Sequence, residues 1–202
     1  MIGFHAFTGC DVTGKLAGRT KEACYKKFFD ADDEILEALA NLGLPDEIPE
    51  GDDLLNLERF VCILYESSRI NNVKDLRWNL YSRKQAEGEN LPPTMGALLE
   101  HIKRAHYMAM VYVRNLISVQ DLPSPESYGW KFNQDRGIYE PVMTLVSPAP
   151  AAIFDLVKCN CKKGCLKGCS CKKVFLGYTE MCGCIDFDCS NPYNKYYSKC
   201  WK

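Results

Sequence analysis

The sequence predicts a mainly α-helical protein, with a helical body followed by an irregular, cysteine-rich C-terminal module. Apolar residues recur at helical spacing over three long stretches before residue 120, and prolines and glycines separate these stretches. Eight of the twelve cysteines lie between Cys159 and Cys189. A chain of 202 residues, 47% hydrophobic and 25% charged, has the composition of an ordinary globular protein with one or two small domains.

The first predicted region covers residues 1–45. A short apolar run ends in Thr8-Gly-Cys-Asp11, a glycine–lysine turn follows, and a helical pattern extends from about Thr20 to Leu42. The apolar face of this helix is formed by Ala23, Phe28, Ile35, Leu36, Leu39 and Leu42. The acidic run of Asp30, Asp32, Asp33 and Glu34 is interpreted as a solvated face, and Pro45 and Pro49 then break the chain.

Two helices are predicted in the first part of the second region, residues 46–120. One extends over residues 51–65 with Asp52 or Asp53 as its N-cap. Cys62 falls within its apolar pattern and is expected to be a small buried hydrophobic residue. The other extends over residues 73–81, and its inward side is expected to contain Leu76, Leu80 and Trp78.

The longest helix is predicted from Thr94, which can cap it, to about Val119. Its apolar stripe consists of Leu98, Leu99, Ile102, Ala105, His106, Ala109, Val113 and Leu116. His101 and His106 are five residues apart, so they lie on different faces and lack the i, i+4 spacing of a helical zinc site. Both are therefore interpreted as structural or surface histidines.

The third region, residues 121–157, is predicted to be irregular because prolines recur in it. Trp130 and Tyr139 are expected to pack back onto the helices, and Ser147-Pro-Ala-Pro150 is typical of a semi-rigid linker. The last region, residues 192–202, combines aromatic residues with lysines. It is interpreted either as a base-stacking surface or as a frayed terminus.

The fourth region, residues 158–191, contains three Cys-x-Cys pairs. The two sulfurs of such a pair do not easily form a disulfide with each other, but they can converge on a metal ion, and thiolate is a preferred ligand of zinc. The density of cysteines favours a compact cluster in which sulfurs bridge zinc ions. The predicted ligands are Cys159, Cys161, Cys165, Cys169, Cys171, Cys182, Cys184 and Cys189.

A disulfide scaffold and a decayed, metal-free tail are the alternative explanations of this cysteine density. Zinc is favoured because no secretory signal is visible at the start of the chain, the cysteines are concentrated at one end, and lysines are interleaved with them. We therefore expect a nuclear or cytoplasmic protein rather than a secreted one. No apolar run is long enough to span a membrane.

The cysteine-rich end of the chain is basic, although the net charge of the whole chain is −1. From Lys158 to Lys202 there are nine lysines and three acidic residues. Two interpretations stay open: the lysines contact DNA phosphates, or they balance the negative charge of a thiolate cluster. The candidate DNA-binding residues are Lys162, Lys163, Lys167, Lys172 and Lys173.

Residues 159–191 resemble a tesmin-type CXC domain, a DNA-binding module that holds three zinc ions on nine cysteines. The order Cys-x-Cys, Lys-Lys, Cys, Cys-x-Cys and the closing Cys189-Ser-Asn191 follow that pattern. Tyr178 stands where the family has a further cysteine, and Gly168 stands where it has a tyrosine that contacts DNA. The resemblance therefore implies DNA as the partner and two or three zinc ions, the third depending on a substitute ligand such as Cys200.

Residues 1–29 resemble the C-terminal edge of the PIN-like nuclease domain of flap endonucleases, where a Gly-x-Asp at a strand end supplies a metal-binding carboxylate. The resemblance implies that Asp11 is a remnant of that carboxylate, whereas Thr20 replaces a glycine of the family's DNA-holding turn. Nearly the whole chain also resembles the C-terminal part of a group of transposon-associated animal proteins, through Thr8-Gly-Cys-Asp11, residues 91–94 and 100–107 and the cysteine-rich tail.

The function that these features favour is a zinc-binding, DNA-associating module on a helical body of transposon-like origin, with no small-molecule substrate. One alternative is a remnant or accessory part of a structure-specific nuclease whose catalytic half lies upstream. Another is a protein-interaction module with a purely structural zinc cluster. Two-metal phosphodiester chemistry needs several convergent carboxylates, so we expect that the chain is not an enzyme on its own.

Overall fold

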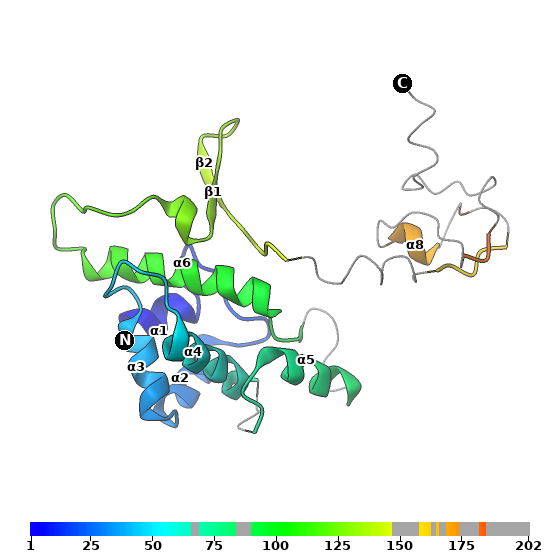
Figure 1. Cartoon of the computed structure of the whole chain (residues 1–202), viewed down its shortest axis with the longest axis horizontal. Helices are drawn as coiled ribbons and strands as arrows, with labels where there is room; N and C mark the ends of the chain where they lie inside the picture. The colour runs from blue at the N-terminus through cyan, green and yellow to red at the C-terminus, as the bar shows by residue number, and fades with distance from the viewer. Residues whose placement is uncertain are drawn as a thin grey trace. The chain divides into compact units, whose positions relative to one another are not determined.

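A computed structural model describes residues 1–65, 69–83, 90–146, 158–162, 165, 169–173 and 182–184. The chain divides into two compact units, residues 1–146 and residues 147–202. The first unit, which we call the body, is mainly α-helical as predicted (Figure 1). The predicted boundaries after residues 45 and 120 both fall inside it. In the second unit, the described residues include the short helix α8 (Ser170–Lys173) and a group of cysteines.

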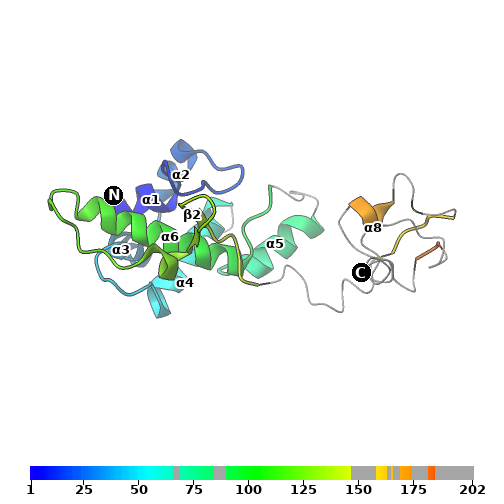
Figure 2. The same ribbon diagram turned by 90° about the horizontal axis from the view of Figure 1, so that it is seen from above.

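The core of the body forms where the short helix α1 (Ile2–Phe7) meets α6 (Met95–Val113) and α3 (Asp33–Asn41). Helix α3 in turn packs along α4 (Gly51–Leu64), and Figures 1 and 2 show α6 passing beside α1. Helices α1 and α3 approach closely because residue 3 is glycine: a Cβ there would lie 1.9 Å from the Leu39 carbonyl oxygen. The side chains buried in this core include Phe7, Ile35, Leu39, Leu57, Phe60 and Ile102.

The helical pattern of residues 20–42 folds as two helices, α2 (Lys21–Phe29) and α3, and not as one. Thr20 caps α2, since its side chain accepts the N–H of Ala23 at 3.2 Å. Residues 30–32 separate the helices, and Asp32 is extended at the start of α3. Aspartate is poor inside helices and favoured at their ends, which explains the break. The acidic run is exposed, as predicted.

The next two predicted helices are confirmed as α4 and α5 (Val73–Ser82). The Val73 N–H donates to the Glu58 carboxylate at 2.7 Å, which joins α5 to α4. Cys62 is fully buried, and burial raises the pKa of its thiol to about 12. Two details are wrong. Glu50 occupies the N-cap of α4 without a side-chain cap, and Trp78 is 70% exposed and does not face the core.

Helix α6 begins after the predicted cap, Thr94, which accepts the Ala97 N–H at 3.3 Å. The helix ends at Val113 and not near residue 119, so Leu116 lies beyond it and is 96% exposed. Arg114 is the C-cap and the first residue outside the helix. Its guanidinium donates to the Asp121 carbonyl at 2.6 Å, which holds the following segment back against the end of α6.

The two histidines of α6 are structural, as predicted. His101 Nε2 lies 2.7 Å from the Phe7 carbonyl oxygen and so joins α6 to the end of α1. His106 accepts the Gly43 N–H at Nδ1 and donates from Nε2 to the Pro45 carbonyl at 3.1 Å. Burial lowers the pKa of both imidazoles, because a charged ring at either position would be kept out of water at a cost in free energy.

The region after α6 contains regular structure that the sequence analysis did not predict. A 3₁₀ helix, η2 (Pro125–Tyr128), leads into β1 (Trp130–Asn133), which pairs antiparallel with β2 (Ile138–Pro141). Buried Arg104 of α6 donates to the carbonyls of Gly129 and Val142 and so fixes the base of the hairpin. The turn ends at Gly137, whose φ of +63° favours glycine.

Tyr128, and not Tyr139, is the tyrosine that packs on α6. Its ring lies 6.1 Å from that of His106 in a stacked arrangement. Tyr139 is 44% exposed and contacts Phe132, its partner across the hairpin, and Trp130 is half-buried in β1. The predicted linker at 147–150 and the aromatic–basic residues 192–202 lie outside the described residues. None of the described helices has the length and apolar character needed to cross a lipid bilayer.

Candidate metal centre

The described cysteines of the second unit converge into two groups. The Sγ atoms of Cys159, Cys161, Cys165 and Cys169 all lie within 4.8 Å of one another, and so do those of Cys159, Cys182 and Cys184. Cys159 belongs to both groups. Cys171 adjoins the second group, with its Sγ 3.7 Å from that of Cys182. Seven of the eight predicted ligands therefore come together.

The distances between sulfurs suit a metal ion and not disulfides. Cys159 Sγ lies 3.8 Å from the sulfurs of Cys165 and Cys184, and these two are 3.6 Å apart. Bonded sulfurs would be about 2.05 Å apart, and none of the described cysteines forms a disulfide. Four sulfurs at about 2.3 Å from a tetrahedral zinc ion lie about 3.8 Å from one another. These cysteines could therefore hold a metal ion.

Backbone hydrogen bonds bring the cysteine segments together. The Gly183 N–H donates to the Cys159 carbonyl at 2.7 Å, which places residues 182–184 beside residue 159 although they are distant in sequence. Residue 183 has little room for a side chain, since a Cβ there would lie 3.3 Å from the Asn160 Cα. Helix α8 brings Cys171 to the group, and the Lys172 N–H donates to the Cys169 sulfur at 3.4 Å.

Most of these sulfurs are shielded from water. Cys159, Cys165, Cys169, Cys171 and Cys184 are buried, and Cys161 and Cys182 are half-buried. Burial and the neighbouring Cys182 thiol raise the pKa of Cys171 to about 12. Burial also opposes ionisation of Cys169, but the Lys172 N–H and the surrounding thiols hold its pKa below the ordinary value. Ionising so many adjacent thiols therefore requires a compensating cation.

The predicted DNA-binding lysines are described only in part. Lys162 and Lys173 are exposed, and Lys172 is half-buried. Lys163, Lys167 and the eighth predicted ligand, Cys189, lie outside the described residues, as do Gly168, Tyr178 and Cys200.

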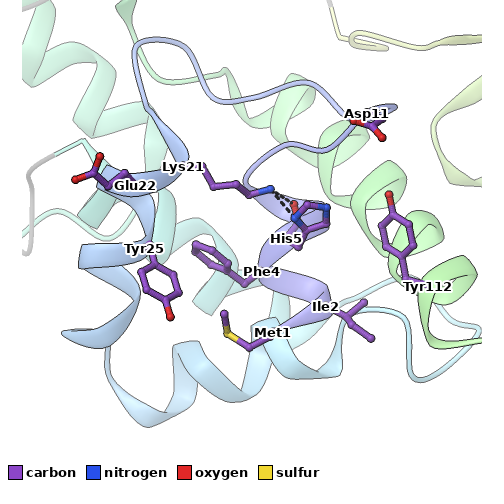
Figure 3. A pocket seen from close by; sticks show the side chains of 9 residues that line it. All are labelled: Met1, Ile2, Phe4, His5, Asp11, Lys21, Glu22, Tyr25 and Tyr112. Atoms are coloured by element: carbon purple, nitrogen blue, oxygen red, sulfur yellow. Dashed lines mark hydrogen bonds between the residues drawn. The ribbon is translucent and has the colours of Figure 1, made fainter.

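Among the described residues, Asp11 does not belong to a group of three potential metal ligands. Among the described histidines, cysteines and acidic residues, only the two cysteine groups bring three or more potential ligand atoms together. Asp11 is exposed, and Figure 3 shows its carboxylate turned away from Lys21 and His5. The segment before it is helix α1, whereas the resemblance to PIN-like nucleases implies a strand.

A groove of about 800 Å³ on the body is a feature that the sequence analysis missed. It is bordered by α1, α2 and Tyr112 of α6 (Figure 3). The ammonium group of Lys21 lies 2.7 Å from His5 Nδ1 and donates to the carbonyls of His5 and Gly9. Because all three of its protons have acceptors, Lys21 acts as a bridge between α2 and the end of α1 and offers no free charge to a ligand.

Comparison of the chain with protein-family models, with curated proteins and with solved structures gave no match. The class of protein is therefore defined by the chain's own structure: a mainly α-helical body, and a separate cysteine-rich unit that could bind metal.

Proposed function

We propose that the second unit binds zinc through a compact thiolate cluster and that this cluster positions lysines for contact with DNA. The observation that supports the proposal most strongly is the membership of Cys159 in both sulfur groups. One ion would be held by Cys159, Cys161, Cys165 and Cys169, and a second by Cys159, Cys171, Cys182 and Cys184. Zinc is favoured because an all-thiolate donor set suits it and closed four-ligand sites are typical of structural zinc.

Metal binding would fold this part of the chain. Its ligands come from several short segments, and the free energy of binding zinc to thiolates becomes free energy of folding. Lys162 and Lys173 flank ligands and are exposed, so metal binding would also fix their backbone positions. Lysines ordered in this way favour binding to the phosphates of DNA, in keeping with the proposed transposon-like origin.

Metal content tests the first half of this proposal. We expect two or three zinc ions per chain by elemental analysis under reducing conditions, and strong thiolate-to-metal absorbance after cobalt substitution. Cys159→Ser should remove the equivalent of both ions, whereas Cys169→Ser should remove one, because only Cys159 is common to both groups. Cys10→Ser, in the body, is the matched control and should retain full metal content. A wild-type chain without metal would refute the proposal.

Salt-dependent DNA binding tests the second half. Affinity for duplex DNA should fall with salt, and removing Lys162 and Lys173 should lower the slope of log K against log salt by about 0.9 per phosphate contact. Lys131→Ala, an exposed lysine on the hairpin of the body, is the control and should leave the slope unchanged. If the zinc-loaded chain binds no DNA at any salt concentration, the cluster is structural and the protein-interaction alternative is favoured.

A further inference from the structure

Helix α5 exposes two large aromatic side chains on one face. Trp78 is 70% exposed and Tyr81 is 58% exposed. Because they are three residues apart on the helix, their side chains are neighbours on its surface. Val73 and Leu76 on the opposite side are buried, so α5 already has a face for the core. Two adjacent aromatic rings in solvent are a typical feature of a binding surface.

A lysine lies beside this aromatic pair. Lys74 is one turn before Trp78 and two turns before Tyr81, so it lies on the same face of the helix. It is exposed, and within the described part of the chain it forms no ion pair. The acidic residue of α5, Asp75, is held at the first turn, where its carboxylate accepts the side-chain amide of Asn72 at 2.9 Å. We call Lys74, Trp78 and Tyr81 the α5 face.

The remaining cation of α5 has a structural role. The Arg77 guanidinium donates to the Pro92 carbonyl and is half-buried, so it fixes α5 to the segment before α6. Helix α5 packs on α4, and Figures 1 and 2 both show it at the edge of the body. Helix α5 is thus held against the body on one side, and the α5 face is exposed on the other side.

We propose that the α5 face binds single-stranded nucleic acid. Bases would stack on Trp78 and Tyr81, and a phosphate would pair with Lys74. Exposed aromatic rings beside a cation are the combination that single-strand binding proteins use. A duplex is excluded by the same rings, because its base faces are already stacked on one another. An apolar protein surface would leave the Lys74 ammonium without a counter-charge. This site belongs to the body and does not depend on the proposed zinc cluster.

The experiment uses the full chain with Trp130→Phe and Trp201→Phe, which leaves Trp78 as the single tryptophan. Oligothymidylate of about 12 nucleotides, within the usual site size, should quench Trp78 emission on saturation. Affinity is measured separately from the anisotropy of a labelled oligonucleotide. The chain used also carries Lys162→Ala and Lys173→Ala, which weaken the proposed DNA binding by the second unit. Trp78→Ala should weaken binding by about 5- to 150-fold, and Trp78→Phe by less, because a ring remains.

Charge is tested in the same background. Lys74→Ala should lower the salt slope by about 0.7, the value for one phosphate of a single strand, and Lys131→Ala should leave it unchanged. Far-UV circular dichroism checks that each variant is folded, as expected for exposed residues. The proposal is overturned if the oligonucleotide does not quench Trp78, or if Trp78→Ala binds as tightly as its parent. It is also overturned if Trp78→Ala abolishes self-association of the chain without affecting oligonucleotide binding.

Discussion

Burial and hydrogen bonding give three cysteines of the body different pKa values. Burial opposes ionisation of Cys10, but hydrogen bonds with Thr13 and Tyr112 and with the backbone of Val12 and Thr13 outweigh it and hold the pKa of Cys10 below its ordinary value. Burial instead raises the pKa of Cys24, and it raises that of Cys62 to about 12. The hydrogen bond to Cys10 also raises the pKa of Tyr112 to about 12, because the phenol serves as the donor.

Alkylation followed by peptide mapping tests this difference. Because the thiolate is the reactive form, a lowered pKa moves the onset of labelling to lower pH. Iodoacetamide should therefore label Cys10 at neutral pH, well before Cys24 or Cys62. Tyr112→Phe removes a donor and should move the labelling midpoint of Cys10 to higher pH. Equal labelling rates for the three thiols in the folded chain would contradict this prediction.

At individual residues, the sequence predicted the ligands of the candidate metal centre better than their arrangement. Thiolate density at Cys-x-Cys spacing indicates metal regardless of fold. Cys159 belongs to both sulfur groups because residues 182–184 lie beside it. The hydrogen bond from the Gly183 N–H to the Cys159 carbonyl holds them there. No spacing rule encodes that contact. Asp11 is the opposite case. Its motif resembles one that follows a strand, but in this chain it follows helix α1.

Among the elements, the contact between α1 and α3 allows almost no added volume. A Cβ on Gly3 would lie 1.9 Å from the Leu39 carbonyl oxygen, a backbone atom that moves only if a helix moves. We expect Gly3→Ala to lower the free energy of unfolding by about 1–3 kcal/mol or more, as for other overpacked cores. Chemical denaturation followed by circular dichroism measures it.

Gly14→Ala is the matched control, because a Cβ at residue 14 would meet nothing within 4 Å. Its effect on the free energy of unfolding should lie within about 0.5 kcal/mol of zero, or be slightly stabilising. If both variants have the same stability, the helices are not packed as closely as the structure indicates.

The existence of the long helices was predictable, but several ends were not. Apolar periodicity located α4, α5 and α6, since a buried face must repeat with the helix. The break between α2 and α3 had a local signal in the aspartates at residues 30, 32 and 33. The hairpin also had one, the turn from Asn133 to Gly137. The end of α6 had no clear local signal, because Leu116 continues the apolar pattern of the sequence although no neighbouring residue covers it.

At the scale of the whole body, the buried histidines make stability depend on pH. His101 and His106 join α6 to two other parts of the body and have lowered pKa values. The unfolded chain takes up protons first as pH falls, so these imidazoles contribute stability above about pH 6.5 that is lost on acidification. We expect the free energy of unfolding to fall from pH 7 to pH 5, by up to about 1.4 kcal/mol per pH unit for each histidine.

Helix unfolding monitored by circular dichroism with a chelator present isolates this effect from metal loss. His101→Gln and His106→Gln should each lower stability at pH 7 and flatten its pH dependence. Gly14→Ala, which adds a Cβ in open space and no titratable group, is the control and should leave the pH dependence unchanged. A pH dependence that neither buried-site variant alters would assign the acid sensitivity to other groups.

The position of Cys159 in both sulfur groups has a consequence for a population of chains. Under the proposed ligand assignment, the first ion to bind draws Cys159 and its hydrogen-bonded partner segment into place, and the second ion finds its ligands already ordered. Loading is then cooperative. When the supply of metal is limiting, the population divides into fully loaded and empty chains, with few half-loaded ones. The number of folded C-terminal units would rise steeply over a narrow range of free metal.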